Sequence, residues 1–76
     1  MARAKVELYG GPLDGEIAER DIIDLPGKFP IVEHRGKKRG KKTRRYIYQA
    51  RGFLPFDGEG AMPFDFIQVI FRDDEL

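Results

Sequence analysis

The sequence of 76 residues has no cysteine, serine, asparagine or tryptophan, and it has a single histidine. Without cysteine the chain can form no disulfide and offers no thiolate to zinc. The commonest enzyme nucleophiles are missing, because the one aliphatic hydroxyl, Thr43, lies among lysines and arginines with no base nearby in sequence. His34 cannot build a zinc site unless carboxylates fill almost every other ligand position. We therefore expect a protein without enzymatic activity, metal or cofactor.

Acidic residues are densest between Asp14 and Asp24, where five carboxylates are interleaved with other residue types. Paired carboxylates can transfer protons in catalysis. Here the interleaving with glycine and isoleucine is more typical of the solvated face of a strand. We assign this segment no site.

Long apolar runs are also missing. No segment approaches the roughly 20 apolar residues that a membrane-spanning helix needs. Residues 1–5 are charged and lead directly into an alternating pattern, without the apolar core of a signal peptide. The sequence predicts a cytoplasmic protein that does not enter a membrane.

Short strands separated by glycine and proline account for most of the chain, which at this length forms a single domain spanning residues 1–76. Residues 4–9 alternate between apolar and polar, and a glycine-rich turn follows at 10–15. Residues 16–25 have mixed parity, which a bulge or one helical turn would explain. Residues 64–72 carry apolar groups on both faces, as in a central or covered strand. The pattern predicts a mainly β fold, either a small barrel or a highly curved antiparallel sheet of about five strands.

Positive charge is concentrated in residues 35–45, where eight of eleven residues are basic and none is acidic. The eight cations are Arg35, Lys37, Lys38, Arg39, Lys41, Lys42, Arg44 and Arg45. The rest of the sequence holds six cations and thirteen carboxylates, so the net charge of +1 hides a cationic segment on a body of charge −7. If residues 31–34 pair with residues 43–51, the basic run becomes the tip of a long hairpin.

Eight neighbouring cations repel one another unless an anion neutralises them, and a phosphate backbone supplies such anions. We expect the hairpin to bind DNA or RNA with little sequence selectivity, because no recognition helix is visible. A solvated loop without a partner and contact with an acidic protein surface are the other interpretations of this run. Tyr46, Tyr48 and Phe53 lie just downstream and could stack on unpaired bases, although core positions are the simpler interpretation.

Residues 7–15 read Glu-Leu-Tyr-Gly-Gly-Pro-Leu-Asp-Gly, and residues 46–48 read Tyr-Ile-Tyr. In these motifs the sequence resembles a group of small proteins encoded by bacteriophages and actinobacteria. Those proteins carry a Gly-Gly-Pro-Leu-Asp-Gly turn after the first strand and a Tyr-x-Tyr strand near the end. The resemblance implies a phage or mobile-element origin, and it brings no catalytic residue because the motif is turn chemistry.

A protein-interaction module is the alternative function. The segment of residues 53–66 combines glycine and proline with large apolar side chains, which include Phe53, Phe56, Met62 and Phe64. Large apolar groups in such a loop are typical of an anchor in a protein interface. With the phage-like turn, the expected partner is a host enzyme or a virion component, and a homodimer through the same surface is also expected to be possible.

Overall fold

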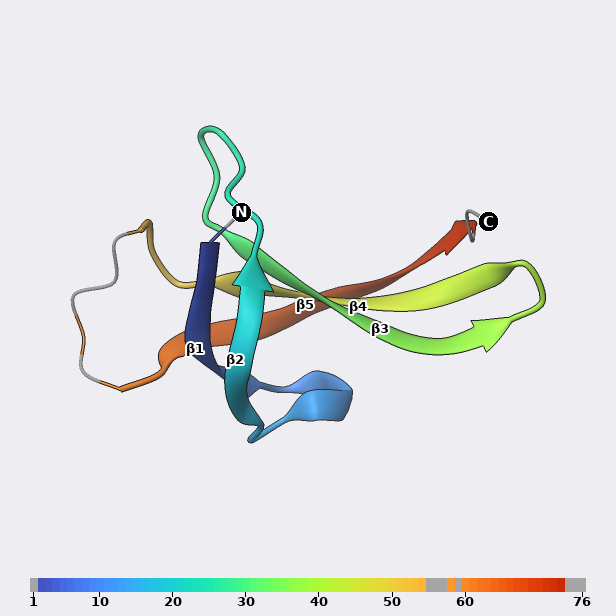
Figure 1. Ribbon diagram of the computed structural model, residues 1–76, viewed down its shortest axis with the longest axis horizontal. Helices are drawn as coiled ribbons and strands as arrows, with labels where there is room; N and C mark the ends of the chain where they lie inside the picture. Colours follow the sequence, from blue (N-terminus) through green and yellow to red (C-terminus); the bar gives the residue numbers. More distant parts are fainter. Residues whose placement is uncertain (1, 55–57, 59, 74–76) are drawn as a thin grey trace.

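Five strands form one mixed sheet in the computed structural model, which describes residues 2–54, 58 and 60–73 (Figure 1). The strands are Ala2–Tyr9 (β1), Ile17–Ile22 (β2), Ile31–Arg39 (β3), Lys42–Ala50 (β4) and Met62–Asp73 (β5), with a short 3-10 helix at Gly11–Leu13 (η1). Their order across the sheet is β2-β1-β5-β4-β3. The mainly β fold of about five strands predicted from the sequence is confirmed.

The sheet is mixed, so the prediction of a wholly antiparallel sheet is wrong for one pairing. β1 runs parallel to β5, from Val6 beside Met62 to Tyr9 beside Asp65. The other three pairings are antiparallel. Glycine and proline turns predict hairpins between strands that follow one another in the chain. They carry no information about distant strands, and β1 and β5 are 56 positions apart at Val6 and Met62.

The sheet curves until its two edge strands, β2 and β3, approach each other. One bridge joins them just beyond β2, where the backbones of Ile23 and Ile31 exchange two hydrogen bonds of 2.9 Å. Side chains add a second connection, from Arg20 of β2 to His34 of β3. Of the two predicted forms, the fold is therefore the highly curved sheet and not a closed barrel.

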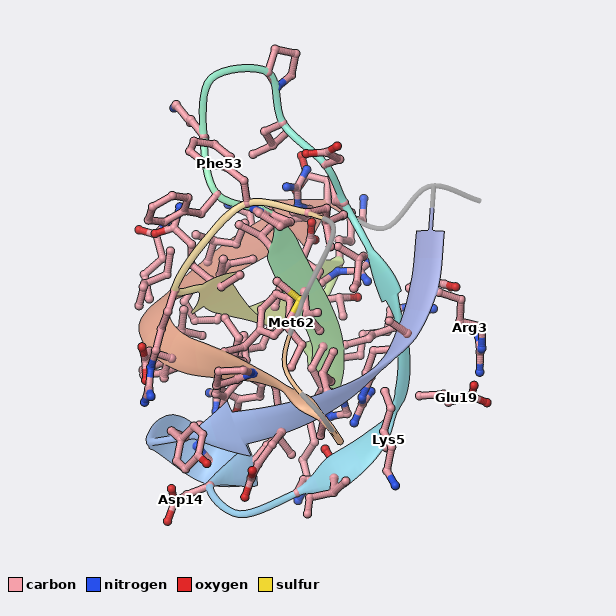
Figure 2. All side chains as sticks on the ribbon, turned by 90° about the vertical axis from the view of Figure 1, so that its left-hand side faces the viewer. Arg3, Lys5, Asp14, Glu19, Phe53 and Met62 are labelled. Atoms are coloured by element: carbon pink, nitrogen blue, oxygen red, sulfur yellow. The ribbon has the colours of Figure 1, made fainter. Side chains whose placement is uncertain are left out.

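The core lies inside this curve. Its members share almost complete burial, and they are Val6, Leu8, Ile22, Val32, Tyr48, Ala50, Met62 and Phe64. Figure 2 shows Met62 enclosed by the strands, while Lys5 and Glu19 point away from them. The alternation predicted for residues 4–9 is confirmed, because Val6 and Leu8 are buried and Lys5 is exposed.

β2 needs neither the bulge nor the helical turn expected for residues 16–25. Its register with β1 runs without a shift from Ile17 to Ile22. Ile22 is fully buried, and Ile17, on the opposite face, is 53% exposed. The strand ends at Ile22, and Ile23 belongs to the bridge with β3. The apolar residues of this segment switch from one set of alternating positions to the other because the strand ends at Ile22.

The glycine-rich turn at residues 10–15 is held by Tyr48 from the opposite side of the core. The Tyr48 hydroxyl donates to the carbonyl of Gly10 at 2.8 Å and accepts from the N–H of Leu13 at 3.0 Å. Gly11 has a φ of +62°, and a Cβ there would lie 2.6 Å from Cγ of Phe66. A side chain at Gly11 would meet both the strain of this backbone conformation and the packed ring.

β3 and β4 form the hairpin that the sequence predicts, and the end of β5 lies along it (Figure 1). β1 pairs with β5 at residues 62–65, whereas β4 continues beside β5 to Asp73. Three strands thus project from the rest of the molecule. The whole molecule, these strands included, measures 41 × 27 × 18 Å along its principal axes. We call residues 34–46 and 69–73 the arm, and the other described residues the body.

Candidate nucleic-acid interface

The arm brings the eight predicted cations together, seven of them on two paired strands and Lys41 in the turn between the strands. Nine of the eleven residues of the basic run, 35–39 and 42–45, belong to β3 and β4, so the turn itself is confined to Gly40 and Lys41. Lys37, Lys41 and Lys42 are exposed. The sequence correctly predicted the hairpin but not the extent of its strands, because a run of lysine and arginine carries little strand signal.

Positive and negative charges are separated between the arm and the body. β5 adds Arg72 and one carboxylate, Asp73, so the arm holds nine cations and a formal charge of +8. The other described residues hold five cations and eight carboxylates, a formal charge of −3. An approaching polyanion is therefore attracted to the arm and repelled by the body.

The register of the hairpin sets like charges opposite each other. Arg35 is registered with Arg45, and Arg39 with Lys42. Directly opposed like charges destabilise a strand pair. The register also shifts between Arg35 and Lys38, which places a bulge within the cationic part of β3. The hairpin accordingly folds with its cations closer together than charge alone would favour.

Three arginines of the body pair with carboxylates of the body, and Arg72 of the arm pairs with Glu33 at 3.1 Å. Arg51 donates two hydrogen bonds of 2.8 Å to the carboxylate of Asp65. The hydrogen bonds from Arg51 lower the pKa of Asp65 from its usual value. Arg3 contacts Asp21 at 3.3 Å, and Arg20 forms an ion pair with Glu16. These cations are thus partly neutralised within the folded chain.

One face of the arm combines cations with rings. Arg44 lies opposite Phe71, and its guanidinium carbon is 5.7 Å from the centre of that ring. Nη1 of Arg44 also donates to the hydroxyl of Tyr46 at 3.2 Å. The ring of Tyr46 stacks on His34 with centres 6.2 Å apart, and Val69 is registered with Tyr46 on the other side. This row crosses all three strands of the arm.

His34 connects the arm to the opposite edge of the sheet. Nη1 of Arg20 lies 3.0 Å from Nδ1 of His34, and since arginine has no acceptor, this nitrogen of His34 accepts the hydrogen bond. Burial, followed by the charge of Arg20, lowers the pKa of His34 from its ordinary value of 6.5, and Glu16 partly opposes that shift. His34 therefore acts as a neutral acceptor at neutral pH.

The residues predicted for the alternative function do not form one surface. Met62 is 3% exposed and Phe64 is fully buried, so both belong to the core, and neither can anchor a partner on the outside of this fold. Phe53 is 60% exposed and packs edge-to-face on Phe29 with ring centres 4.6 Å apart. Phe56 lies outside the described residues. The sequence pattern predicts a strand that begins at residue 64, and the glycine and proline before it give no sign that β5 begins at Met62.

Tyr48 is a core residue that holds the turn, whereas Tyr46 lies on the arm and is partly buried against the core. Sequence reasoning missed Val69 and Phe71 as exposed members of the arm, because apolar residues on both faces of residues 64–72 indicated a covered strand. The length of β5 is the signal that could have identified them. A strand of 12 residues extends beyond β1, which has 8, and leaves its far end without β1 beside it.

Comparisons of the chain with protein-family models, with curated proteins and with solved structures gave no match. Within residues 2–54, 58 and 60–73, no group of three or more histidine and carboxylate side chains is placed to hold a metal ion. The described chain also has no helix of the length and apolarity needed to cross a membrane.

Proposed function

We propose that this chain is a small nucleic-acid-binding protein whose arm contacts the phosphate backbone with little sequence selectivity. The observation that carries the proposal is the gathering of nine cations and one carboxylate on the arm, with Lys37, Lys41 and Lys42 exposed. Phosphates beside these cations would neutralise part of their charge and lower the cost of bringing them together. Binding to nucleic acid is then favoured by the same electrostatics that weakens the isolated hairpin.

Contact is confined to the arm. The described residues outside it carry a formal charge of −3, which repels phosphates, so the nucleic acid would not wrap the domain. Lysines and arginines that bind phosphates position a protein without reading bases. The proposal includes a cytoplasmic location in a bacterial or phage-infected cell, which is supported by the resemblance of the turn motif.

Two matched double variants test the proposal. Lys37→Gln with Lys41→Gln removes two exposed cations from the arm, and Lys5→Gln with Lys28→Gln removes two exposed cations from the body. Each pair changes the formal net charge from +1 to −1. Affinity for duplex DNA, single-stranded DNA and single-stranded RNA is measured by fluorescence anisotropy from about 50 to about 200 mM salt.

We expect the arm variant to bind about tenfold or more weakly at the lowest salt. The slope of log affinity against log salt should be shallower by about one to two, since each lost phosphate contact removes roughly 0.9 from that slope. The body variant should keep both the affinity and the slope of the unmodified chain. Equal losses in the two variants, or no salt-dependent binding by the unmodified chain, would show that the arm is not a phosphate-binding site.

A further inference from the structure

The exposed apolar side chains of the arm are not explained by phosphate binding. Val69 is 42% exposed and Phe71 is 49% exposed, yet both lie among cations on a strand whose partner, β4, carries Arg44 and Lys42. Phosphate contacts need positive charge and hydrogen-bond donors, and they gain nothing from a phenyl ring. Leaving a large apolar side chain in water forgoes the free energy of its burial. This face therefore presents an apolar surface that phosphate binding leaves unexplained.

Side-chain geometry makes this face a platform. Directly opposed residues share a face, as do residues two apart in one strand, so Val69, Phe71, Tyr46 and Arg44 lie on the same side of the arm. Val69 and Phe71 span roughly 7 Å along β5, which matches the rise of about two stacked nucleotides. The guanidinium carbon of Arg44 lies over the Phe71 ring, 5.7 Å from its centre, so one face of the ring meets this cation and the other face is the one on which a base could stack.

We infer that this face binds single-stranded nucleic acid, with an unpaired base stacked on Phe71 and packed against Val69, and with phosphates contacting Arg44 and Lys42. The inference rests on the proposed function and specifies its ligand. Charge complementarity identifies the occupant as a polyanion, and the exposed ring identifies it as one that also presents flat apolar surfaces. A duplex keeps its bases stacked on one another and offers none of them to Phe71.

The test compares three probes that share a phosphate backbone. They are an oligothymidylate of about twelve nucleotides, an abasic strand of the same length, and a duplex of the same length. Phe71→Ala removes the ring from the arm. Phe53→Ala is the matched control, because Phe53 is an exposed phenylalanine of the body, 60% exposed and packed on Phe29.

We expect Phe71→Ala to bind oligothymidylate about tenfold more weakly and to bind the abasic strand and the duplex within about twofold of the unmodified chain. Phe71→Leu keeps an apolar group of similar size and should lose the same preference for bases, which separates stacking from a loss of folding. Phe53→Ala should bind all three probes as the unmodified chain does.

Equal losses on oligothymidylate and the abasic strand would overturn the inference while leaving phosphate binding by the arm intact. A loss of similar size for Phe53→Ala would overturn it as well, since the effect would then not belong to the arm. No binding of any probe at low salt would instead overturn the proposed function itself. A duplex bound more tightly than oligothymidylate by the unmodified chain would assign the arm to double-stranded ligands.

Discussion

Tyr48 couples two segments that lie 35 positions apart, because its hydroxyl bonds both Leu13 and Gly10 of the turn. The ring itself is fully buried and packs on Phe66 with centres 5.3 Å apart. The Gly-Gly-Pro-Leu-Asp-Gly and Tyr-x-Tyr motifs are therefore one hydrogen-bonded unit in this chain. Gly11 completes the unit, since the close approach of Phe66 and the Tyr48 hydroxyl leaves no room for a Cβ.

Replacing Tyr48 with phenylalanine tests this unit. Tyr48→Phe keeps the ring but removes one acceptor and one donor, leaving the N–H of Leu13 and the carbonyl of Gly10 without that partner. We expect the free energy of unfolding to fall by about 1–3 kcal/mol, measured by urea denaturation. Tyr9→Phe is the control, since Tyr9 is exposed and its loss of a hydroxyl should change stability by less than about 0.5 kcal/mol.

Among the elements, the sequence predicted those that depend on local pattern. The alternation in β1, the turn after it and the β3–β4 hairpin all follow from period-two patterning and glycine placement. The parallel pairing of β1 with β5 could not be predicted, because it depends on contacts across the whole chain. The core position of Met62 was missed because the strand was expected to begin at residue 64, and the glycine-rich segment before it has no local marker for the earlier start at Met62.

β5 also places a carboxylate at the far end of the arm, where Asp73 is registered with Lys42. This residue lowers the positive potential that a polyanion meets, so Asp73→Asn should strengthen binding of single-stranded DNA. We expect an affinity gain of about two- to fivefold at about 50 mM salt, since exposed ion pairs are worth roughly 0.2–1 kcal/mol. The gain should vanish at high salt, where surface charges are screened.

Asp24→Asn provides the matched control for Asp73→Asn. Asp24 is exposed on the body, and its replacement changes the net charge of the chain by the same amount. A gain confined to Asp73→Asn would identify the arm as the place where the charge acts. An identical gain in both variants, measured by fluorescence anisotropy across the same salt series, would attribute the effect to net charge and contradict the expectation.

At the scale of the whole molecule, the curvature of the sheet brings its two edges together through the bridge of Ile23 with Ile31 and the contact of Arg20 with His34. Tyr46 stacks on His34 from β4, and Glu16 lies near enough to raise its pKa in part. Protonation of His34 would remove the acceptor for Arg20 and set two cations against each other. The connection between the two edges of the sheet should therefore weaken in acid.

The sign of this effect follows from the lowered pKa of His34. The unfolded chain, in which histidine has its ordinary value of 6.5, binds a proton at a higher pH than the folded chain does. The contribution of His34 to the free energy of unfolding is complete above pH 6.5, and it is lost as the pH falls toward the lowered pKa of His34 in the folded chain. Urea denaturation between about pH 8 and about pH 5 should show this loss in the unmodified chain.

His34→Gln provides the comparison, because glutamine keeps a hydrogen-bond acceptor and does not titrate. The carboxylates of the chain titrate in both proteins, so the difference between the two curves isolates His34. We expect the curves to diverge as the pH falls below about 6.5, with the unmodified chain losing more stability. Parallel curves over the whole range would show that His34 does not contribute to this connection.

The parallel pairing of β1 with β5 sets the order in which the parts of this domain can form. Val6 and Met62 are 56 positions apart, so their contact must wait until almost the whole described chain is available, and closing so long a loop is slow. The β3–β4 hairpin closes between neighbouring segments, and hairpins form within about 1–10 μs. We expect the cationic hairpin to form transiently before the acidic body surrounds its base. During synthesis it would therefore be available to nucleic acid, the messenger RNA included, before β1 has found its place in the sheet.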